Sequence, residues 1–139
     1  MELHLHLADL VPGFLIRTRG SEAADALRQR IGEHEIRRAI LDMQADSPVG
    51  QGFIDEMVVQ AARIEAEGGP EIVFVVRDAD MLRRFQNTVN WRDLTCRVRL
   101  ADETEIRTLE PDGTEPDRPP VRFETKAEIF GGAADASVS

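Results

Sequence analysis

The stretch that decides the fold is EIVFVV, residues 71–76, in which five apolar residues follow one glutamate. β-Branched and aromatic residues favour an extended strand. A strand without alternating polar residues is typical of a parallel sheet that is buried on both faces. The Gly-Gly-Pro turn at 68–70 precedes this segment, and Asp78 follows it as a candidate helix N-cap. We therefore expect residues 71–76 to form a central strand between two helices.

Strands and helices alternate outward from this strand in both directions. On its N-terminal side, apolar residues recur at helical spacing from Phe53 onward, and a short apolar strand ends near Asp42 before them. On its C-terminal side, a helix after Asp78 is followed by the strand LTCRVRL, residues 94–100. Alternating strands and helices need crossover connections, so the sequence predicts an α/β fold with a mostly parallel sheet.

The N-terminal part of the chain predicts a hairpin followed by a helix. In ELHLHLADL, residues 2–10, leucines alternate with histidines as in a strand that has one buried face. Pro12-Gly13 then provides a turn into FLIRTRG, residues 14–20, which we expect to be the second strand. Ser21 is a plausible N-cap for a helix over residues 21–34. The hairpin would add a mixed edge to the parallel sheet.

The C-terminal part divides into a domain end and a tail. We expect one domain over residues 1–109 and an acidic, proline-rich loop in EPDGTEPDRPP, residues 110–120. The alternation in VRFETKAEIF, residues 121–130, predicts an extra edge strand, and such an edge could pair with a second chain in a homodimer. The last segment, 131–139, offers little to bury and is expected to be disordered.

Composition narrows the classes of function. With 26 acidic and 17 basic residues the formal charge is -9, which disfavours nucleic acids and anionic membranes as partners. There is neither an apolar run of about 18 residues nor a secretory signal pattern, so a cytoplasmic location is expected. Cys96 is the single cysteine, and His4 and His6 share a strand face without a third ligand. We therefore expect neither a metal nor a cofactor.

Three blocks carry a family resemblance: FLIRTRGSEAADALRQRI at 14–31, RRAILDMQADSPVGQGFIDEM at 37–57, and GGPEIVFVVRDADMLRRFQ at 68–86. In their order and spacing they resemble the STAS domains of anti-sigma factor antagonists, and more closely a bacterial STAS-like family of unknown function. The resemblance implies a STAS-like fold over residues 1–109 and a non-catalytic signalling role. It also implies a protein partner of the ATP-binding, kinase-like, anti-sigma type.

The resemblance places the docking surface at the junction between the central strand and the next helix. Its predicted contact residues are Asp46, Ser47, Gly50, Gln51, Gly52, Phe53, Asp55 and Glu56. In the antagonists this loop carries a hydroxyl that the partner phosphorylates, and the added charge breaks the complex. Here Gly50-Gln51-Gly52-Phe53 stands at that place and has no hydroxyl. Ser47 is the nearest hydroxyl, with phosphorylation and an N-cap or turn role as its two interpretations.

Alternatives for the same junction stay open at this point. The Gly50 and Gly52 amides could bind phosphate or a nucleotide at a helix start, although the third glycine of a dinucleotide site is missing. Turn geometry or the close approach of a partner's backbone would also require glycine there. Asp55 and Glu56 could stabilise the helix dipole or present an acidic rim to a basic partner. Phe53 is expected in the core, and would be an anchor for a partner only if exposed.

Overall fold

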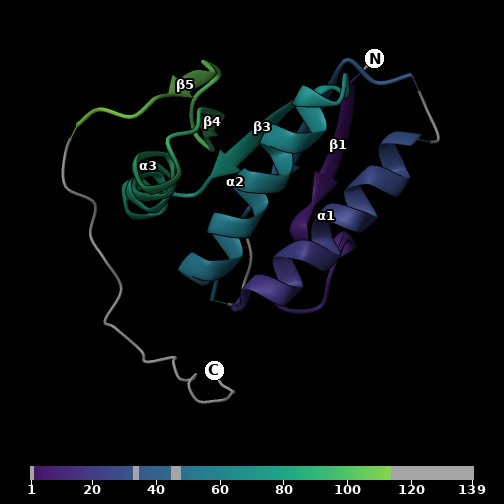
Figure 1. Ribbon diagram of the computed structural model, residues 1–139, viewed down its shortest axis with the longest axis horizontal. Coiled ribbons are helices and arrows are strands. Elements are labelled where there is room, and N and C mark those ends of the chain that lie inside the picture. Colours follow the sequence, from purple (N-terminus) through teal and green to yellow (C-terminus); the bar gives the residue numbers. More distant parts are fainter. Residues whose placement is uncertain (1, 33–34, 45–47, 114–139) are drawn as a thin grey trace.

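A five-stranded sheet organises the fold, as the computed structural model of the chain shows (Figure 1). The structure describes residues 2–32, 35–44 and 48–113. Its strands are β1 (Glu2–His6), β2 (Arg38–Asp42), β3 (Glu71–Val76), β4 (Cys96–Leu100) and β5 (Arg107–Leu109), and they lie side by side in that order. Neighbours from β1 to β4 are parallel, and β5 is antiparallel to β4. The prediction of an α/β fold with a mostly parallel sheet is confirmed.

The helices cover one face of this sheet. They are α1 (Arg17–Gly32), α2 (Gln51–Ala66) and α3 (Ala79–Arg92), and a short 3-10 turn, η1 (Leu7–Asp9), follows β1. Each crossover moves one strand further in the same direction, so right-handed connections place all three helices on the same side. Buried residues of the three helices accordingly form one core cluster with one set of strand residues. In Figure 1, α1 and α2 lie in front of the sheet.

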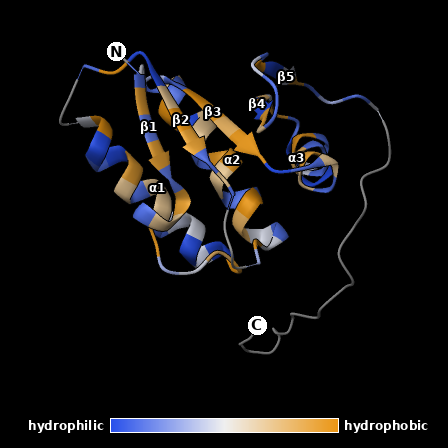
Figure 2. Ribbon diagram, turned by 180° about the vertical axis from the view of Figure 1, so that it is seen from behind, coloured by the Kyte–Doolittle hydropathy of each residue, from blue (hydrophilic) through white to orange (hydrophobic). Residues whose placement is uncertain are grey.

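The central strand β3 is buried on both faces, as its sequence predicted. Phe74 faces the helices, where its ring packs against Phe85 of α3 with 5.0 Å between centroids. Val73 and Val75 point the other way and form a second, smaller cluster with Ile40 of β2. Figure 2 shows the hydrophobic colouring of these strands from behind. Burial of side chains of this size stabilises the fold by about 1.5–3 kcal/mol each.

The predicted N-terminal hairpin is wrong. β1 pairs with β2 in parallel register, and residues 17–20 form the first turn of α1 instead of a strand. Helix α1 begins at Arg17, ahead of Ser21. Gly20 in its first turn is a site of close helix contact, since a Cβ there would lie 2.9 Å from the Cβ of Glu56 in α2. Phe14 turns inward and packs edge-on against Phe53 at 5.8 Å. Residues 14–20 therefore consist of a buried aromatic residue, a two-residue loop and the first turn of α1.

Several other expectations about the chain can be compared with the structure. Helix α2 begins at Gln51, and Asp78 caps α3 by accepting a hydrogen bond from the Met81 amide at 3.0 Å, as predicted. The mixed edge lies at β5, on the opposite side of the sheet from the predicted hairpin. The predicted edge strand over residues 121–130 and the tail over 131–139 lie outside the described residues. In the described part of the chain, no helix is long and apolar enough to cross a membrane.

Cys96 provides a first testable expectation about the core. Its thiol lies at the start of β4 in the main cluster, and burial raises its pKa to about 12. Only the thiolate reacts with alkylating reagents, so the folded protein should resist iodoacetamide at pH 8 while the urea-unfolded protein is modified. Intact-mass measurement after timed quenching reports both rates. Equal rates in the two states would contradict the burial of this thiol.

Candidate functional site

The carboxyl edge of the sheet is the first place to look for a site, because α/β proteins usually bind their ligands there. Here α2 starts after β2, with Gly50 as its N-cap. The Gly50 amide donates a hydrogen bond to the Phe14 carbonyl at 2.7 Å. A Cβ on Gly50 would lie 2.1 Å from the Leu15 carbonyl oxygen, which no side chain could tolerate. The loop before α1 and the start of α2 are thus fixed against each other.

Two apolar side chains project from this fixed loop into solvent. Leu15 is 58% exposed and Ile16 is 56% exposed, and they are the large hydrophobic residues that the described part of the chain leaves open. The preceding residue, Phe14, is buried, so the backbone is anchored while the next two side chains face outward. We call Leu15 and Ile16 the apolar patch. Neighbouring apolar side chains left in water by an otherwise buried set are typical of a binding surface.

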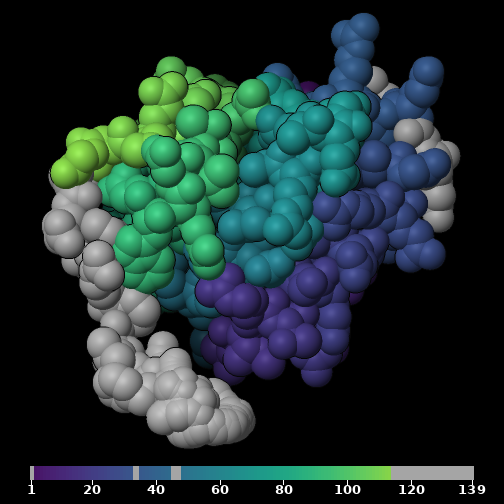
Figure 3. Space-filling view, in the orientation of Figure 1, coloured from purple at the N-terminus to yellow at the C-terminus, as the bar shows by residue number. Residues whose placement is uncertain are grey.

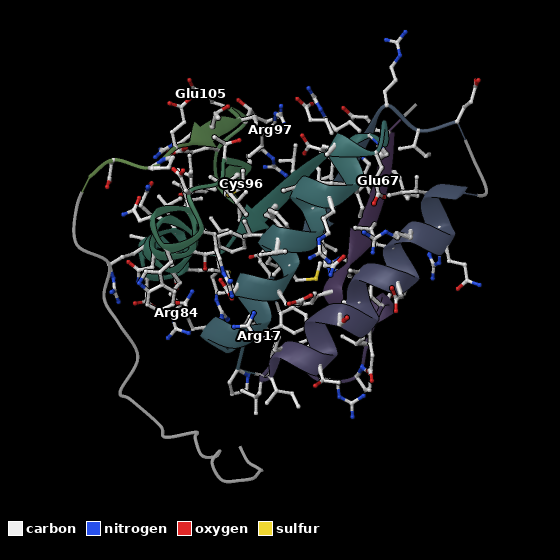
Figure 4. The ribbon with its side chains drawn as sticks, viewed as in Figure 1. Arg17, Glu67, Arg84, Cys96, Arg97 and Glu105 are labelled. Atoms are coloured by element: carbon white, nitrogen blue, oxygen red, sulfur yellow. The ribbon has the colours of Figure 1, made fainter. Side chains whose placement is uncertain are left out.

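Three arginines are connected to the loop that carries the apolar patch or to the start of α2 beside it. Arg17 follows it directly, Arg84 of α3 donates to the Val49 carbonyl at 2.9 Å, and Arg92 of α3 reaches α2 near Arg17. Their side chains are 51%, 39% and 44% exposed, respectively. We call Arg17, Arg84 and Arg92 the arginine rim. Arg17 and Arg84 are labelled in Figure 4, near the start of α2.

A buried carboxylate holds two members of the rim. Asp55 is 1% exposed, and its Oδ2 lies 2.5 Å from Arg17 Nη1, while Arg92 binds both of its oxygens. Burial alone would raise the pKa of Asp55, but hydrogen bonds from Arg92 and Arg17 outweigh it, so this pKa lies below its ordinary value. The ionised carboxylate therefore ties α1, α2 and α3 together at the carboxyl edge.

The predicted contact residues divide between surface and interior. Phe53 is fully buried, as expected for a core residue, and Asp55 is enclosed by its arginines, so neither side chain is exposed to a partner. Glu56 accepts a hydrogen bond from Gln60 at 2.7 Å and also contacts Arg17. Asp46 and Ser47 lie outside the described residues. Of the two interpretations left open for Asp55, an exposed acidic rim does not fit its burial among arginines.

Gln51 and the two glycines line the edge, each in a different role. The Gln51 amide nitrogen donates to the Arg84 carbonyl at 3.1 Å and to Thr88 Oγ1 at 2.9 Å, which joins α2 to α3. Gly50 is needed for the close backbone approach described above. Gly52 has room, since a Cβ there would lie 3.6 Å from the Arg17 amide. Of the predicted set, these three remain at the edge, next to the apolar patch.

The apolar patch and the arginine rim were not predicted from the sequence. Leu15, Ile16 and Arg17 fell in the expected hairpin strand, and no binding role was predicted for Arg84 or Arg92. A usable signal was present, because FLI at 14–16 places three large apolar residues in a row where a strand with one buried face needs only alternate ones. In the space-filling view, the N-terminal segment in purple meets α2 in teal and α3 in green (Figure 3).

Two hollows differ in their suitability for a ligand. One of about 190 Å³ lies at the carboxyl edge, and its lining residues are Pro48, Val49, Arg77, Asp78, Asp80, Met81 and Arg84. A larger, open one of about 600 Å³ lies at the amino ends of the strands, lined by Glu2, Arg37, Arg38 and Glu71. There Arg38 Nε lies 2.6 Å from Glu71, whose hydrogen bond and charge raise the pKa of Arg38. Part of the lining of the larger hollow therefore consists of charged side chains that already pair with each other.

The geometry is less favourable for the alternative of an anion or nucleotide site. The Gly50 amide already donates to Phe14, so the Gly50–Gly52 segment lacks one of the amides that would hold a phosphate. The strand order never reverses, so the described sheet has no switch point of the kind at which dinucleotides bind. Within residues 2–32, 35–44 and 48–113, no group of three or more histidine, cysteine or acidic side chains could hold a metal ion.

Comparisons with protein-family models, with curated proteins and with solved structures found no match in any of the three. What the carboxyl edge can do therefore follows from its geometry and from the sequence.

Proposed function

We propose that this protein is an interaction domain that binds a protein partner at the carboxyl edge of its sheet. The observation that carries this proposal is the apolar patch, in which Leu15 and Ile16 stand 58% and 56% exposed on a fixed backbone. Association would remove both side chains from water, and full burial of such a residue contributes about 1.5–3 kcal/mol. The patch would form the centre of the interface.

The surroundings of the patch favour a protein ligand. Arginine is enriched in interfaces, where its guanidinium forms forked hydrogen bonds with carboxylates and packs on aromatic rings. Asp55 and the Gly50–Phe14 hydrogen bond hold the surface in place before binding, which lowers the entropy lost on association. The expected partner surface therefore has an apolar centre with acidic side chains around it. Such a surface differs from the basic partner that would suit an acidic rim at Asp55 and Glu56.

The class of partner is proposed from the sequence blocks. Blocks 14–31 and 37–57 contribute the two sides of the Leu15–Gly50 contact, so both meet at the proposed surface. Following the STAS-like resemblance, we take the protein to be a bacterial cytoplasmic signalling domain without a catalytic step. Its partner would be an ATP-binding regulator related to anti-sigma kinases. Binding would be governed by a device other than a hydroxyl at residues 50–53.

The test is capture of partners from the host with a tagged full-length protein. Leu15→Asp combined with Ile16→Asp should remove at least nine-tenths of a specifically captured protein, because both charges would have to be desolvated in the interface. The control, Gln29→Asp combined with Thr104→Asp, adds the same charges at exposed positions away from the patch. Circular dichroism and melting should show both variants folded. Equal capture by the two double variants would contradict the proposed surface.

A further inference from the structure

The face of the sheet opposite to the helices carries a hollow of its own. In Figure 2 the strands β1, β2 and β3 are seen from this side, with α1 and α2 behind them. The parallel register places one residue from each of four neighbouring strands at the same level, namely His6, Asp42, Val75 and Arg99. These four residues line a hollow of about 150 Å³, together with His4 and Ile40. The sheet thus brings residues together that are far apart in the sequence.

Opposite charges stand on the two sides of an apolar floor in this hollow. Val75 of β3 lies between Asp42 of β2 and Arg99 of β4 in the register, and it packs with Ile40 in the smaller apolar cluster. Neighbouring strands lie about 4.8 Å apart, so the backbones at Asp42 and Arg99 are separated by roughly 10 Å. A small ligand on Val75 can therefore contact both charges at once.

The Arg99 guanidinium is held in place but has no acidic partner in the described part of the chain. Its Nη1 donates to the Glu103 carbonyl at 2.7 Å and to the Leu100 carbonyl at 3.5 Å. Its Nε and Nη2 donate to none of the described residues. Arg38 and Arg97, by contrast, both pair with Glu71. A half-buried guanidinium with unused donors suits a carboxylate, which it binds through two parallel hydrogen bonds.

The Asp42 carboxylate is also held in place and keeps capacity to accept hydrogen bonds. The Gln44 backbone amide donates to its Oδ1 at 2.9 Å, and the Gln44 side-chain amide donates to its Oδ2 at 3.4 Å. His6 Nδ1 lies 3.6 Å from the same Oδ2, and the Asp42 side chain is partly exposed. A carboxylate offers about four lone-pair sites, so an ammonium group can bind Asp42 beside these contacts.

We propose that this hollow binds a small α-amino acid in its zwitterionic form. The carboxylate of the ligand binds Arg99, its ammonium group binds Asp42, and its side chain lies on Val75 and Ile40. A water molecule takes about 30 Å³ in the liquid, so the hollow has room for roughly five water-sized groups, which suits a small amino acid and not a nucleotide. A zwitterion carries no net charge, so the formal charge of -9 does not repel it. This site shares no residue with the apolar patch and does not rest on the proposed function.

An NMR titration of the full-length protein with each of the common amino acids tests the site. At least one amino acid with a short side chain should shift the amide signals of Val75 and Arg99, with a Kd below about 1 mM. Arg99→Gln and Asp42→Asn should each weaken this binding at least about tenfold, because each removes one charged contact. Arg19→Gln is the control, since Arg19 is an exposed arginine of α1, and it should leave the Kd unchanged. Thermal melting shows whether all three variants are folded.

Modified ligands assign each charge of the amino acid to its residue. The amide of the amino acid lacks the carboxylate, and the N-acetyl form lacks the ammonium group, so each should bind the wild-type protein at least about tenfold more weakly. Arg99→Gln should cause no further loss for the amide, and Asp42→Asn should cause none for the N-acetyl form.

Three outcomes would overturn the inference. The first is that no amino acid shifts the Val75 and Arg99 signals at about 10 mM, a concentration well above the expected Kd. The second is that Arg99→Gln or Asp42→Asn binds the amino acid as tightly as the wild-type protein does. The third is that the amide or the N-acetyl form binds as tightly as the amino acid itself, because the hollow would then not recognise a zwitterion.

Discussion

Asp55→Ala is expected to lower the free energy of unfolding by about 2–3 kcal/mol, because it removes a buried carboxylate that binds arginines from two other helices. The effect is smaller than for a fully buried ion pair, since Arg17 and Arg92 can return to water. Urea denaturation followed by circular dichroism measures it. Asp80→Ala is the matched control: Asp80 also pairs with two arginines but is exposed, so its loss should leave the free energy of unfolding nearly unchanged.

Lowering the pH should remove the contribution of the Asp55 carboxylate to the free energy of unfolding. The folded-state pKa of Asp55 is depressed, so its stabilising contribution is complete above the unfolded value near 4 and is lost as pH falls through the lower folded value. The wild-type protein should therefore lose stability more steeply than Asp55→Ala when the pH is lowered below about 4. Denaturation midpoints at several acidic pH values test this. Parallel curves for the two proteins would contradict an ionised, arginine-bound Asp55.

Gly50→Ala is expected to destabilise the protein by about 1–3 kcal/mol, because its Cβ would lie 2.1 Å from the Leu15 carbonyl oxygen and must push two backbones apart. That movement also weakens the hydrogen bond from the Gly50 amide to Phe14. Gly52→Ala is the matched control within the same turn. It has room for a methyl group and should be neutral or stabilising by up to about 1 kcal/mol.

Unfolding free energies of the two glycine variants decide between a fixed and an adaptable loop. A destabilised Gly50→Ala beside an unaffected Gly52→Ala supports the fixed backbone under the apolar patch. Partner capture by Gly50→Ala should also fall, since Leu15 and Ile16 would no longer be held in position. Equal stability of both variants would show that the loop yields easily and would remove the argument from preorganisation.

The central elements could be predicted because their sequences are locally consistent. EIVFVV has no polar residue after Glu71, so it suits only a strand with two buried faces, and Asp78 marks the next helix start by a capping bond that is local. The apolar residues that recur at helical spacing from Phe53 onward predicted helix α2, because this pattern is also local. Such elements are determined by residues near in sequence, and their order then gives the parallel sheet.

The N-terminal error has a physical cause. FLIRTRG follows a Pro-Gly turn and was predicted as a strand, but the deciding interactions come from α2: Phe14 is buried on Phe53, and Gly20 permits the close approach of Glu56. These partners are more than 30 residues away in sequence. The three consecutive apolar residues at 14–16 indicated that the segment is not a strand with one buried face, but they could not identify these distant partners.

The strand-to-helix junction stays a prediction as a docking surface, and the surroundings of its residues could not be predicted. A partner's backbone was one of the alternatives for a close approach to Gly50, whereas the backbone that lies against Gly50 is this chain's own loop at Leu15. Asp55 looked like a surface acid, because its sequence neighbours do not reveal Arg17 and Arg92, each more than 35 residues away. Burial and pairing across helices thus place Asp55 inside the protein, where it cannot form the acidic rim that was one of its two interpretations.

Site-specific photo-crosslinking tests the central claim most directly. A benzoylphenylalanine at position 15 in the full-length protein, expressed in its host, should give a discrete adduct with a partner on irradiation, whereas the same residue at exposed position 29 should give none. Combining position 15 with Ile16→Asp should remove the adduct. No adduct at position 15, or an equally strong one at position 29, would contradict partner binding at the carboxyl edge.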